Sequence, residues 1–473
     1  MERREFLLFA GSSVAALTAG RIPGAAAATW ARTGAFLTEP DWSPAPLVVN
    51  QAPAGTAPGL LFAAPFDGAA TTSSGPYVFD DTGQPVWLLP LQHVQAQNLR
   101  VQTYLGRPML TWYEGPAATT TSTYGGTCVI YDPTYHEVKR VHGGNGYSCD
   151  LHEFVITSRG TALLSIAGEV AVGGQKVVEG IVQEIEIETG KVLLEWHSLD
   201  HVPLSDSYRG GVTSAGNVDY FHLNSIGVDL DGGLLVSARH TATVYKLDRT
   251  TGRVLWRLGG KHSDFRLGPG ARFWFQHDAR RHSDGTLTVF DNGATDGENG
   301  AVEPASRPLR LGLDLSAMTA DVVRVYTPPT PRLAISMGNV QVLPDGGVFV
   351  GWGILGAFTE FAPDGAVRYD AQFADGSQTY RAFRLPWTAQ PGTLPAIAVA
   401  PGPSVHASWN GATDVAAWEA LAGAAPSALR SVARAPRSGF ETAIPLAARS
   451  GYVAVAALDA SGRRLATSQT VRL

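Results

Sequence analysis

The sequence has few cysteines and few charged residues, and each shortage excludes a class of protein. Cys128 and Cys149 are the only cysteines in 473 residues, too few for a cysteine-based metal site. Charged residues make up 16% of the chain and the net charge is −6, so no general affinity for nucleic acid or anionic membranes is expected. The chain also lacks a serine-nucleophile elbow, a paired-carboxylate motif and a Walker motif, so none of those chemistries is expected.

What the sequence does contain favours an all-β fold. Hydrophobic residues reach 44%, which supplies a substantial core and argues against wholesale disorder. The 53 glycines and 30 prolines fall mainly between short apolar runs. This distribution is typical of an all-β protein with many turns.

The first 28 residues have the features of an export signal. Arg3 and Arg4 form a twin-arginine pattern, residues 7–19 are apolar and mostly small, and residues 23–28 suit a signal peptidase. The apolar stretch is shorter than the roughly 20 residues that span a bilayer, and no later segment is long enough. We therefore expect twin-arginine export, removal of residues 1–28, an extracytoplasmic or secreted mature protein, and no membrane span after cleavage.

The two cysteines bear on the same point. Export implies an oxidising compartment, which favours disulfide bonds. Cys128 and Cys149 are about 20 residues apart, and two cysteines at this spacing in an exported chain predict one disulfide bond.

Turn signals recur along the chain and divide it into similar units. Between Leu223 and Gly260, hairpins at Asp231-Gly232 and Thr251-Gly252 separate four β-prone runs, which is the content of one propeller blade. The same pattern, with a repeat of roughly 50 residues, fits six units: 60–91, 98–141, 152–196, 223–260, 277–325 and 339–373. The sequence thus predicts a six-bladed β-propeller over residues 45–385.

The composition changes after this region. Prolines punctuate residues 386–403, which we interpret as a linker. Residues 404–473 contain short strand-like runs with Trp409, Trp418 and Tyr452 as candidate core residues. About 70 residues of this kind suit a small immunoglobulin- or fibronectin-III-like β-sandwich.

Polar residues recur at one register position of the predicted blades. In a four-stranded blade, the start of the innermost strand and the loop between the second and third strands lie on the same face. His152, His222 and His277 each lie just before a first strand. The second-to-third-strand loops contain Arg239, His240, Asn292, Trp352, Trp112 and Tyr113. We therefore expect these side chains to surround one mouth of the central channel.

The residue types at this mouth suit an anionic aryl ester. Arg239 offers planar, permanently charged donors for a tetrahedral oxyanion such as sulfate. A neutral histidine can attack sulfur or accept the proton of a hydroxyl group. Trp352, Trp112 and Tyr113 can stack on an aromatic leaving group. These residue types therefore fit an anionic ester with an aromatic leaving group.

An ordered set of motifs is similar to one known family. The set comprises His222-Leu223-Asn224-Ser225, then Ser237-Ala238-Arg239-His240, Trp256-Arg257-Leu258-Gly259-Gly260, Gln276-His277-Asp278 and Phe290-Asp291-Asn292-Gly293. It resembles the arylsulfotransferases, exported propellers that move a sulfuryl group from one phenol to another without a nucleotide sulfate donor. The resemblance is strongest to the actinobacterial and fungal branch and extends to Ser408-Trp409-Asn410-Gly411-Ala412-Thr413.

The resemblance implies transfer from a small aryl sulfate to a phenol, with no cofactor, no metal and no nucleic-acid partner. It assigns catalysis to His222, His277, Arg239 and His240. Substrate contacts are expected from a second set: His152, Asn224, Asn292, Trp352, Trp112 and Tyr113. The family pattern also has a histidine in the last blade and an arginine soon after the Phe-Asp-Asn-Gly motif. This chain has Trp352 in the first place and no arginine in residues 294–300, which leaves His222 or His277 as nucleophile, or a changed or lost activity.

Two other functions stay open on the sequence alone. A metal-dependent hydrolase or oxygenase would use His152, His222 and His277 as a three-histidine site. A non-catalytic propeller would bind an aromatic or glycan ligand at the same mouth.

Overall fold

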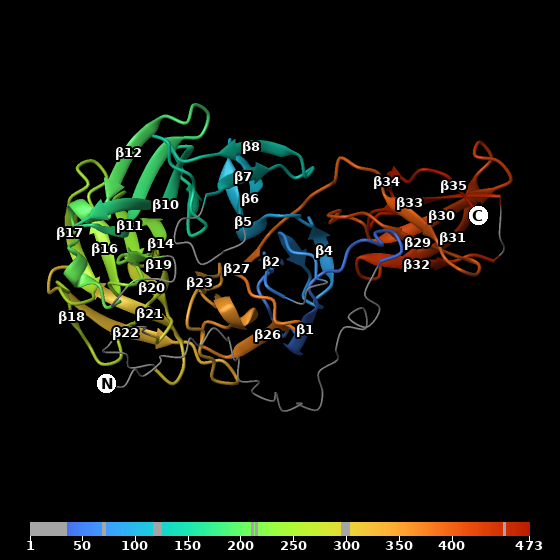
Figure 1. Ribbon diagram of the computed structural model, residues 1–473. Helices are drawn as coiled ribbons and strands as arrows, with labels where there is room; N and C mark the ends of the chain where they lie inside the picture. The colour runs from blue at the N-terminus through green and yellow to red at the C-terminus, as the bar shows by residue number, and fades with distance from the viewer. Residues whose placement is uncertain are drawn as a thin grey trace, which may run out of the picture.

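The computed structural model describes residues 36–68, 72–116, 125–209, 212, 216–294, 303–447 and 451–473, and the predicted signal segment lies outside them. Antiparallel β-sheet dominates the described residues (Figure 1), so the prediction of an all-β protein is confirmed. Helix in this part of the chain is limited to 3-10 turns at Ser198–Asp200 (η2), Leu204–Asp206 (η3) and Gly353–Leu355 (η4). A search of the same residues for a helix long and apolar enough to cross a bilayer finds none.

Strands β1 to β27 form six sheets within the described residues. The first contains β2 (Leu60–Ala63), β3 (Tyr77–Phe79), β4 (Pro85–Leu88) and the distant β27 (Ala382–Leu385). The second contains β5 (Gln95–Tyr104), β6 (Arg107–Gly115), β7 (Thr127–Tyr131) and β8 (Glu137–Val141). The third contains β9 (Phe154–Ile156), β10 (Thr161–Val172), β11 (Gln175–Glu186), β12 (Val192–His197) and the parallel β13 (Asn217–Asp219).

The remaining three sheets follow in chain order. The fourth contains β14 (Leu223–Val228), β15 (Leu234–Ala238), β16 (Thr243–Leu247) and β17 (Val254–Gly259). The fifth contains β18 (Arg266–Leu267), β19 (His277–Arg281), β20 (Thr286–Asp291), β21 (Arg307–Asp314) and β22 (Thr319–Val325). The sixth contains β23 (Asn339–Val342), β24 (Val348–Gly351), β25 (Ala357–Phe361), β26 (Val367–Phe373) and the N-terminal β1 (Leu47–Gln51).

Each repeat unit expected from the sequence contributes strands to one of these sheets. The pairing of β27 with β2 joins the two ends of this region, because residues 382–385 complete a sheet that begins at residue 60. In the same way β1 pairs with β26 at the edge of the sixth sheet. These two long-range pairings leave no periodic signal in the sequence.

Polar side chains tie the first strands of successive sheets to one another. The hydrogen bonds run from Ala279 N to Ser225 Oγ (3.1 Å), from Val340 N to Asp278 Oδ2 (3.2 Å) and from Ala382 N to Asn339 Oδ1 (3.0 Å). Each of these strands is therefore fixed relative to its neighbour. Residues just before the strands are brought together as a consequence.

The C-terminal residues form two further sheets that pack face to face. One contains β28 (Ala396–Val399), β29 (Ser404–Ser408) and β32 (Glu441–Pro445), and the other contains β30 (Ala417–Gly423), β31 (Arg430–Pro436), β33 (Tyr452–Leu458), β34 (Arg464–Thr467) and β35 (Val471–Arg472). Trp409 and Trp418 are buried in their shared core, as expected, whereas Tyr452 is half-buried. Strand β28 lies inside the predicted linker, so this two-sheet unit begins before residue 404.

The Ser408–Thr413 motif joins this unit to the first sheet. The Asn410 amide accepts a hydrogen bond from Leu88 N (3.0 Å) and donates one to Leu88 O (2.9 Å), and Gly411 N donates to Val86 O (2.9 Å). The exposed edge of β4 is thereby covered, which protects it from pairing with another chain. Figure 1 shows β4 beside the orange and red C-terminal strands.

The predicted disulfide bond is wrong for this structure. Cys128 and Cys149 are both free and fully buried. The Cys149 thiol donates to Val141 O (3.4 Å), and burial, with Cys149 as a hydrogen-bonded neighbour, raises the pKa of the Cys128 thiol well above its usual value. The two residues are free cysteines that fill a core, and sequence spacing alone does not distinguish this role from a bridge.

Candidate active site

Four of the predicted site histidines lie together. His152 and His222 come just before β9 and β14, His277 begins β19, and His240 lies between β15 and β16. The ring centroids of His152 and His222 are 4.9 Å apart, and those of His222 and His240 are 4.6 Å apart. The Tyr380 ring contacts both His152 and His277, with centroid distances of 5.4 Å and 6.2 Å.

Each of these histidines has its Nδ1 atom beside an oxygen acceptor. The pairs are His152 with Asp150 Oδ1 (2.7 Å), His222 with Asp219 Oδ2 (2.6 Å), His240 with the Asp219 carbonyl (2.7 Å) and His277 with Asn292 Oδ1 (2.7 Å). Because an oxygen acceptor faces Nδ1, the proton of a neutral ring resides there. Nε2 then carries the lone pair, which is the form that a nucleophile or general base requires.

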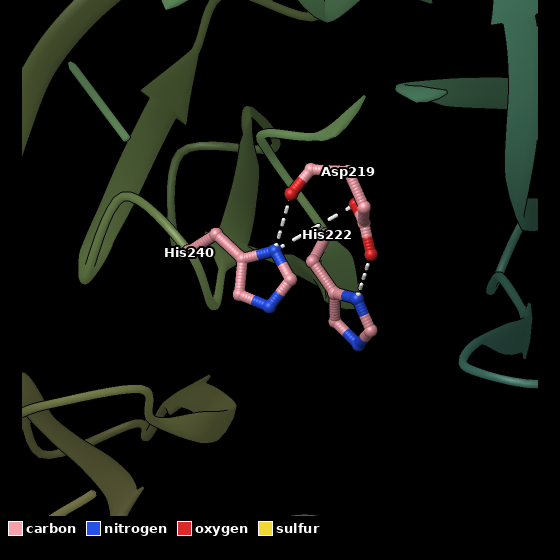
Figure 2. Close-up of side chains that lie close together, drawn as sticks. All are labelled: Asp219, His222 and His240. Carbon is pink, nitrogen blue, oxygen red and sulfur yellow. Dashed lines mark hydrogen bonds and ion pairs between the residues drawn. The ribbon is translucent and has the colours of Figure 1, made fainter. Parts of the chain in front are cut away.

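Asp219 binds two of the histidines at once. Figure 2 shows its carboxylate beside His222 and its main-chain carbonyl beside His240, whose Nδ1 is also 3.7 Å from Asp219 Oδ1. Burial opposes ionisation of Asp219, but His222 and His240 outweigh it and hold the carboxyl pKa well below its usual value. Burial lowers the pKa of His222 to about 4 despite the neighbouring Asp219 carboxylate, so the ring is neutral at physiological pH.

His222 is the histidine best placed to react. Its side chain is 20% exposed, and its Nε2 has no hydrogen-bond partner among the described residues. It borders a small cavity with His152, Asp150 and Asp219. Its backbone is left-handed (φ 54°), a conformation that costs energy for a non-glycine residue and is concentrated at functional sites.

His277 is more enclosed. It is buried, and its Nε2 accepts a hydrogen bond from Met337 N (3.3 Å). Burial, together with the charge of Arg239, lowers its pKa well below the usual value. His277 is therefore a neutral ring beside the site whose lone pair is already in use.

Arg239 places a positive charge at this cluster. Its Nη1 is 2.7 Å from His240 Nε2, its Nη2 donates to Ile335 O (3.2 Å), and its guanidinium lies 4.6 Å from the Phe275 ring centroid. Arg209 contacts the same His240 nitrogen at 3.3 Å. Both guanidinium groups therefore meet at the same nitrogen of His240.

Asn224 and Asn292 were expected to contact the substrate, but both side chains are fully buried. Asn292 is buried and uses its whole amide for His277 and for the carbonyls of Ala334 (2.7 Å) and Met337 (2.9 Å). It therefore positions His277 and does not face a substrate. Asn224 donates to Gln276 O (2.6 Å), while its Oδ1 is buried without a partner among the described residues.

The predicted aromatic contacts are wrong. Trp352, Trp112 and Tyr113 are 0%, 1% and 2% exposed, so none can stack on a substrate. Trp352 donates to Thr359 Oγ1 (2.9 Å), and Trp112 donates to Glu114 Oε1 (3.0 Å), both inside cores. Trp352 lies in the expected loop between β24 and β25, whereas Trp112 and Tyr113 lie within strand β6 and not in a loop. All three side chains point into the packed sheets.

A different aromatic pair borders the arginines. The rings of Tyr208 and Trp274 are half-buried and meet edge to face at 5.0 Å. Tyr208 N donates to the His240 carbonyl (2.8 Å), and Trp274 N donates to Asp291 Oδ1 (2.8 Å), so both residues are fixed beside the cluster. Lys261 and Arg272 lie over the two rings at 5.0 and 5.6 Å. Sequence reasoning missed this pair because both residues lie in irregular connections outside the repeat.

Sequence reasoning also left the acids that orient the histidines unassigned. Asp150 precedes His152 by two residues, and Asp219 precedes His222 by three. An aspartate two or three residues before His152 and before His222 was therefore the sequence signal that could have identified these acids.

The atoms of Asp219, His222 and His240 also have the spacing of a metal site. One ligand atom from each lies within 4.8 Å of the others. However, both Nδ1 atoms already face Asp219 oxygens, and His240 Nε2 faces Arg239. A cation bound here would compete with these hydrogen bonds and with the guanidinium charge, so the geometry favours a hydrogen-bonded Asp–His pair.

The chain was compared with known families, curated proteins and solved structures. None of the curated proteins matches it. Three solved structures are similar at low identity: a Bacteroides caccae protein of unknown function (14% identity, 70% of this chain and 100% of that one, TM-score 0.43), a catalytically inactive virginiamycin B lyase from Staphylococcus aureus with quinupristin (8%, 77% and 97%, 0.36) and the Dos1 propeller (10%, 82% and 75%, 0.30). The model of the arylsulfotransferase (ASST) family matches residues 100–374. This match spans more than half of the chain and includes His152, His222, Arg239, His240 and His277, and the protein therefore belongs to the arylsulfotransferase family.

Proposed function

We propose that the protein transfers a sulfuryl group from an aryl sulfate to a phenol, without a nucleotide donor, at one mouth of a six-bladed propeller formed by the six sheets. The C-terminal sheets are proposed to be a fibronectin-III-like accessory domain, and residues 1–28 a twin-arginine signal for export. The observation that carries the reaction is the Asp219–His222 pair, which presents an unengaged Nε2 on a ring beside those of His152 and His240. Arg239 contacts the His240 ring.

The proposed reaction has two steps. In the first, the Nε2 lone pair of His222 forms a bond to sulfur while the bond from sulfur to the aryl oxygen breaks, and the phenolate leaves with its electron pair. In the second, the oxygen of the acceptor phenol attacks sulfur and the N–S bond breaks. The acceptor proton passes to His152, and from there to a leaving phenolate, so the exchange is balanced. Asp219 stabilises the positive imidazole ring of the intermediate.

Arg239 and Arg209 are proposed to bind the sulfuryl oxygens. A planar guanidinium matches two oxygens of a tetrahedral anion, and positioning with charge neutralisation carries most of the catalysis in the analogous phosphoryl transfers. The aromatic pair of Tyr208 and Trp274 is proposed to receive the aryl ring, with Lys261 and Arg272 favouring an anionic aromatic substrate.

Incubation with a chromogenic aryl sulfate tests the proposal. Release of the coloured phenol should be slow alone and should accelerate when a second phenol is added, with sulfate appearing on the added phenol. Release without transfer would indicate a hydrolase. Binding of the aryl sulfate without release would indicate a non-catalytic propeller.

Replacing Arg239 with lysine is expected to lower kcat/KM by about tenfold to a hundredfold, because a point charge cannot reproduce a charge-assisted two-point contact. Steady-state kinetics with the aryl sulfate measures the change. Arg430→Lys, at an exposed position in β31 of the C-terminal sheets, is the control and should leave kcat/KM unchanged. Equal losses in the two variants would contradict the assignment of Arg239.

Replacing Trp274 with leucine is expected to raise KM for the aryl sulfate about three- to tenfold with little change in kcat, because a stacked ring contributes about 0.5–1.5 kcal/mol beyond its buried area. Trp274→Phe keeps a ring and should retain most of the affinity. A KM that is unchanged in Trp274→Leu would place the aryl group elsewhere.

The pH dependence follows from the neutral His222. We expect kcat/KM to stay level as the pH falls through 6.5 and to drop only near the His222 pKa of about 4, where protonation removes the nucleophilic lone pair. Because the His222 pKa is about 4 in the folded protein and 6.5 in the unfolded chain, unfolding takes up a proton between pH 6.5 and about 4. The stability of the fold therefore falls as the pH is lowered through this range. Folding must be checked by circular dichroism at each pH. A drop centred near 6.5 in folded protein would show that another group controls the reaction.

A second candidate is a metal-dependent hydrolase, which rests on the spacing of Asp219, His222 and His240 alone. Elemental analysis of the purified protein and activity after chelator treatment separate it from the first. If the protein contains one metal ion per chain and loses turnover when the ion is removed, the proposed transfer through a sulfuryl group on His222 is wrong.

A further inference from the structure

A second pocket lies at the opposite ends of the strands that carry the histidines. His152, His222 and His277 lie where β9, β14 and β19 begin, whereas this pocket is lined by residues at and after the ends of the same strands. Its volume is about 320 Å³, and its lining contains Arg100, Arg249, Arg280, Arg281, Thr157 and Ser158. Among the described residues that line it, none is acidic. It is therefore a basic pocket separate from the proposed active site.

The three arginines that meet at Glu153 are incompletely neutralised. Arg100, Arg280 and Arg381 share two carboxylates, those of Glu153 and Asp278. Three cations on two anions leave one net positive charge in a buried network. The Nε–H of Arg100 is buried without a hydrogen-bond partner among the described residues, and burial lowers the pKa of Arg100 to about 10.

The other arginines at and beside the pocket add to this excess of positive charge. Arg249 and the more exposed Arg159 both pair with Glu184, which leaves a second net positive charge. Arg281 pairs with Asp229, which Lys246 also contacts at 2.6 Å. Lys246 has a further carboxylate partner in Asp231, so this last group is neutral. The ion pairs around the pocket thus carry an excess of two positive charges, which a bound anion would offset.

We propose that this pocket binds a tetrahedral oxyanion, either free sulfate or phosphate or the anionic group of an ester. Guanidinium groups match tetrahedral oxyanions through paired N–H donors, and the exposed Ser158 can add a hydroxyl donor. The excess of two charges corresponds to one dianion. The proposal concerns binding alone and does not depend on sulfuryl transfer at the histidines.

Two variants of one residue test it. Ser158→Asp places a carboxylate at the pocket, and Ser158→Asn has nearly the same shape without the charge. Isothermal titration calorimetry at constant ionic strength would use sodium sulfate, sodium phosphate and phenyl phosphate, none of which donates a sulfuryl group to an acceptor. We expect Ser158→Asn to bind like the native protein, and Ser158→Asp to bind at least about tenfold more weakly, because a like charge at short range repels the anion.

The titrations also identify the form of the ligand. Tighter binding of sulfate or phosphate assigns a free oxyanion, and tighter binding of phenyl phosphate assigns an ester. Arg249→Gln gives a second measurement and should weaken the same ligand. Equal affinity in Ser158→Asp and Ser158→Asn, or the absence of binding to native protein at millimolar concentrations, would overturn the proposal. Neither result would bear on transfer between phenols.

Discussion

Replacing His222 with alanine is expected to lower sulfuryl transfer by at least about 10²–10⁴-fold, the range for loss of a positioned acid or base. The physical reason is specific to this ring: Asp219 fixes its Nδ1, burial keeps it neutral, and its Nε2 has no partner among the described residues. In the native protein, rapid quenching with an alkaline denaturant during turnover, which preserves the acid-labile N–S bond, should reveal a sulfuryl group on His222 by peptide mass spectrometry at neutral to alkaline pH. In His222→Ala that adduct should disappear together with the activity.

The controls separate chemistry from folding. His142 is exposed, and His142→Ala should keep the native rate. Added imidazole should partly restore His222→Ala if the residue supplies the nucleophile, since the free ring can occupy the vacated space. Asp219→Asn should lose rate while retaining the adduct site. If His222→Ala stays fully active, or if the adduct maps to His277, the assignment of the nucleophile is wrong.

Much of the fold could be predicted from the sequence because hairpins leave local marks. In the unit from Leu223 to Gly260, Asp231-Gly232 and Thr251-Gly252 located both turns, and the four expected strands correspond to β14–β17. The left-handed glycines at 232 and 252 show why these turns need that residue. The pairings of β27 with β2 and of β1 with β26 join residues more than 300 positions apart, and no local pattern reports them.

The candidate site could be predicted at the level of the backbone but not of side-chain direction. The register placed His152, His222 and His277 at strand starts, and the hydrogen bonds from Ile226 N to Glu153 and from Ala279 N to Ser225 bring those starts together. The same register placed Trp352 in the right loop, yet its side chain turns inward to Thr359. Periodicity states where a residue lies along the strand. Which core its side chain enters depends on packing across several sheets.

Replacing Glu153 with glutamine is expected to lower the free energy of unfolding by about 3–5 kcal/mol, the cost of removing one partner from a buried ion pair. Glu153 is fully buried and contacts Arg100 (2.8 Å), Arg381 (3.0 Å) and Arg280. These three arginines hold the pKa of Glu153 well below its usual value, although burial alone would raise it. The neutral amide keeps the size of the side chain but leaves three guanidinium groups with only the carboxylate of Asp278. The change should therefore appear as a lower urea midpoint.

The matched control is Glu137→Gln, which removes a carboxylate from a partly exposed pair with Arg140 (2.7 Å). Its expected cost is below about 1 kcal/mol, because water already screens both charges. Glu153→Gln should also reduce transfer, since Arg381 adjoins Tyr380, whose ring contacts His152 and His277. Assays must therefore be run well below the urea midpoint of the variant. A loss of stability no larger than that of Glu137→Gln would contradict the view that Glu153 holds these three arginines together. Full activity in a destabilised Glu153→Gln would show that this ion-pair network does not position the histidines.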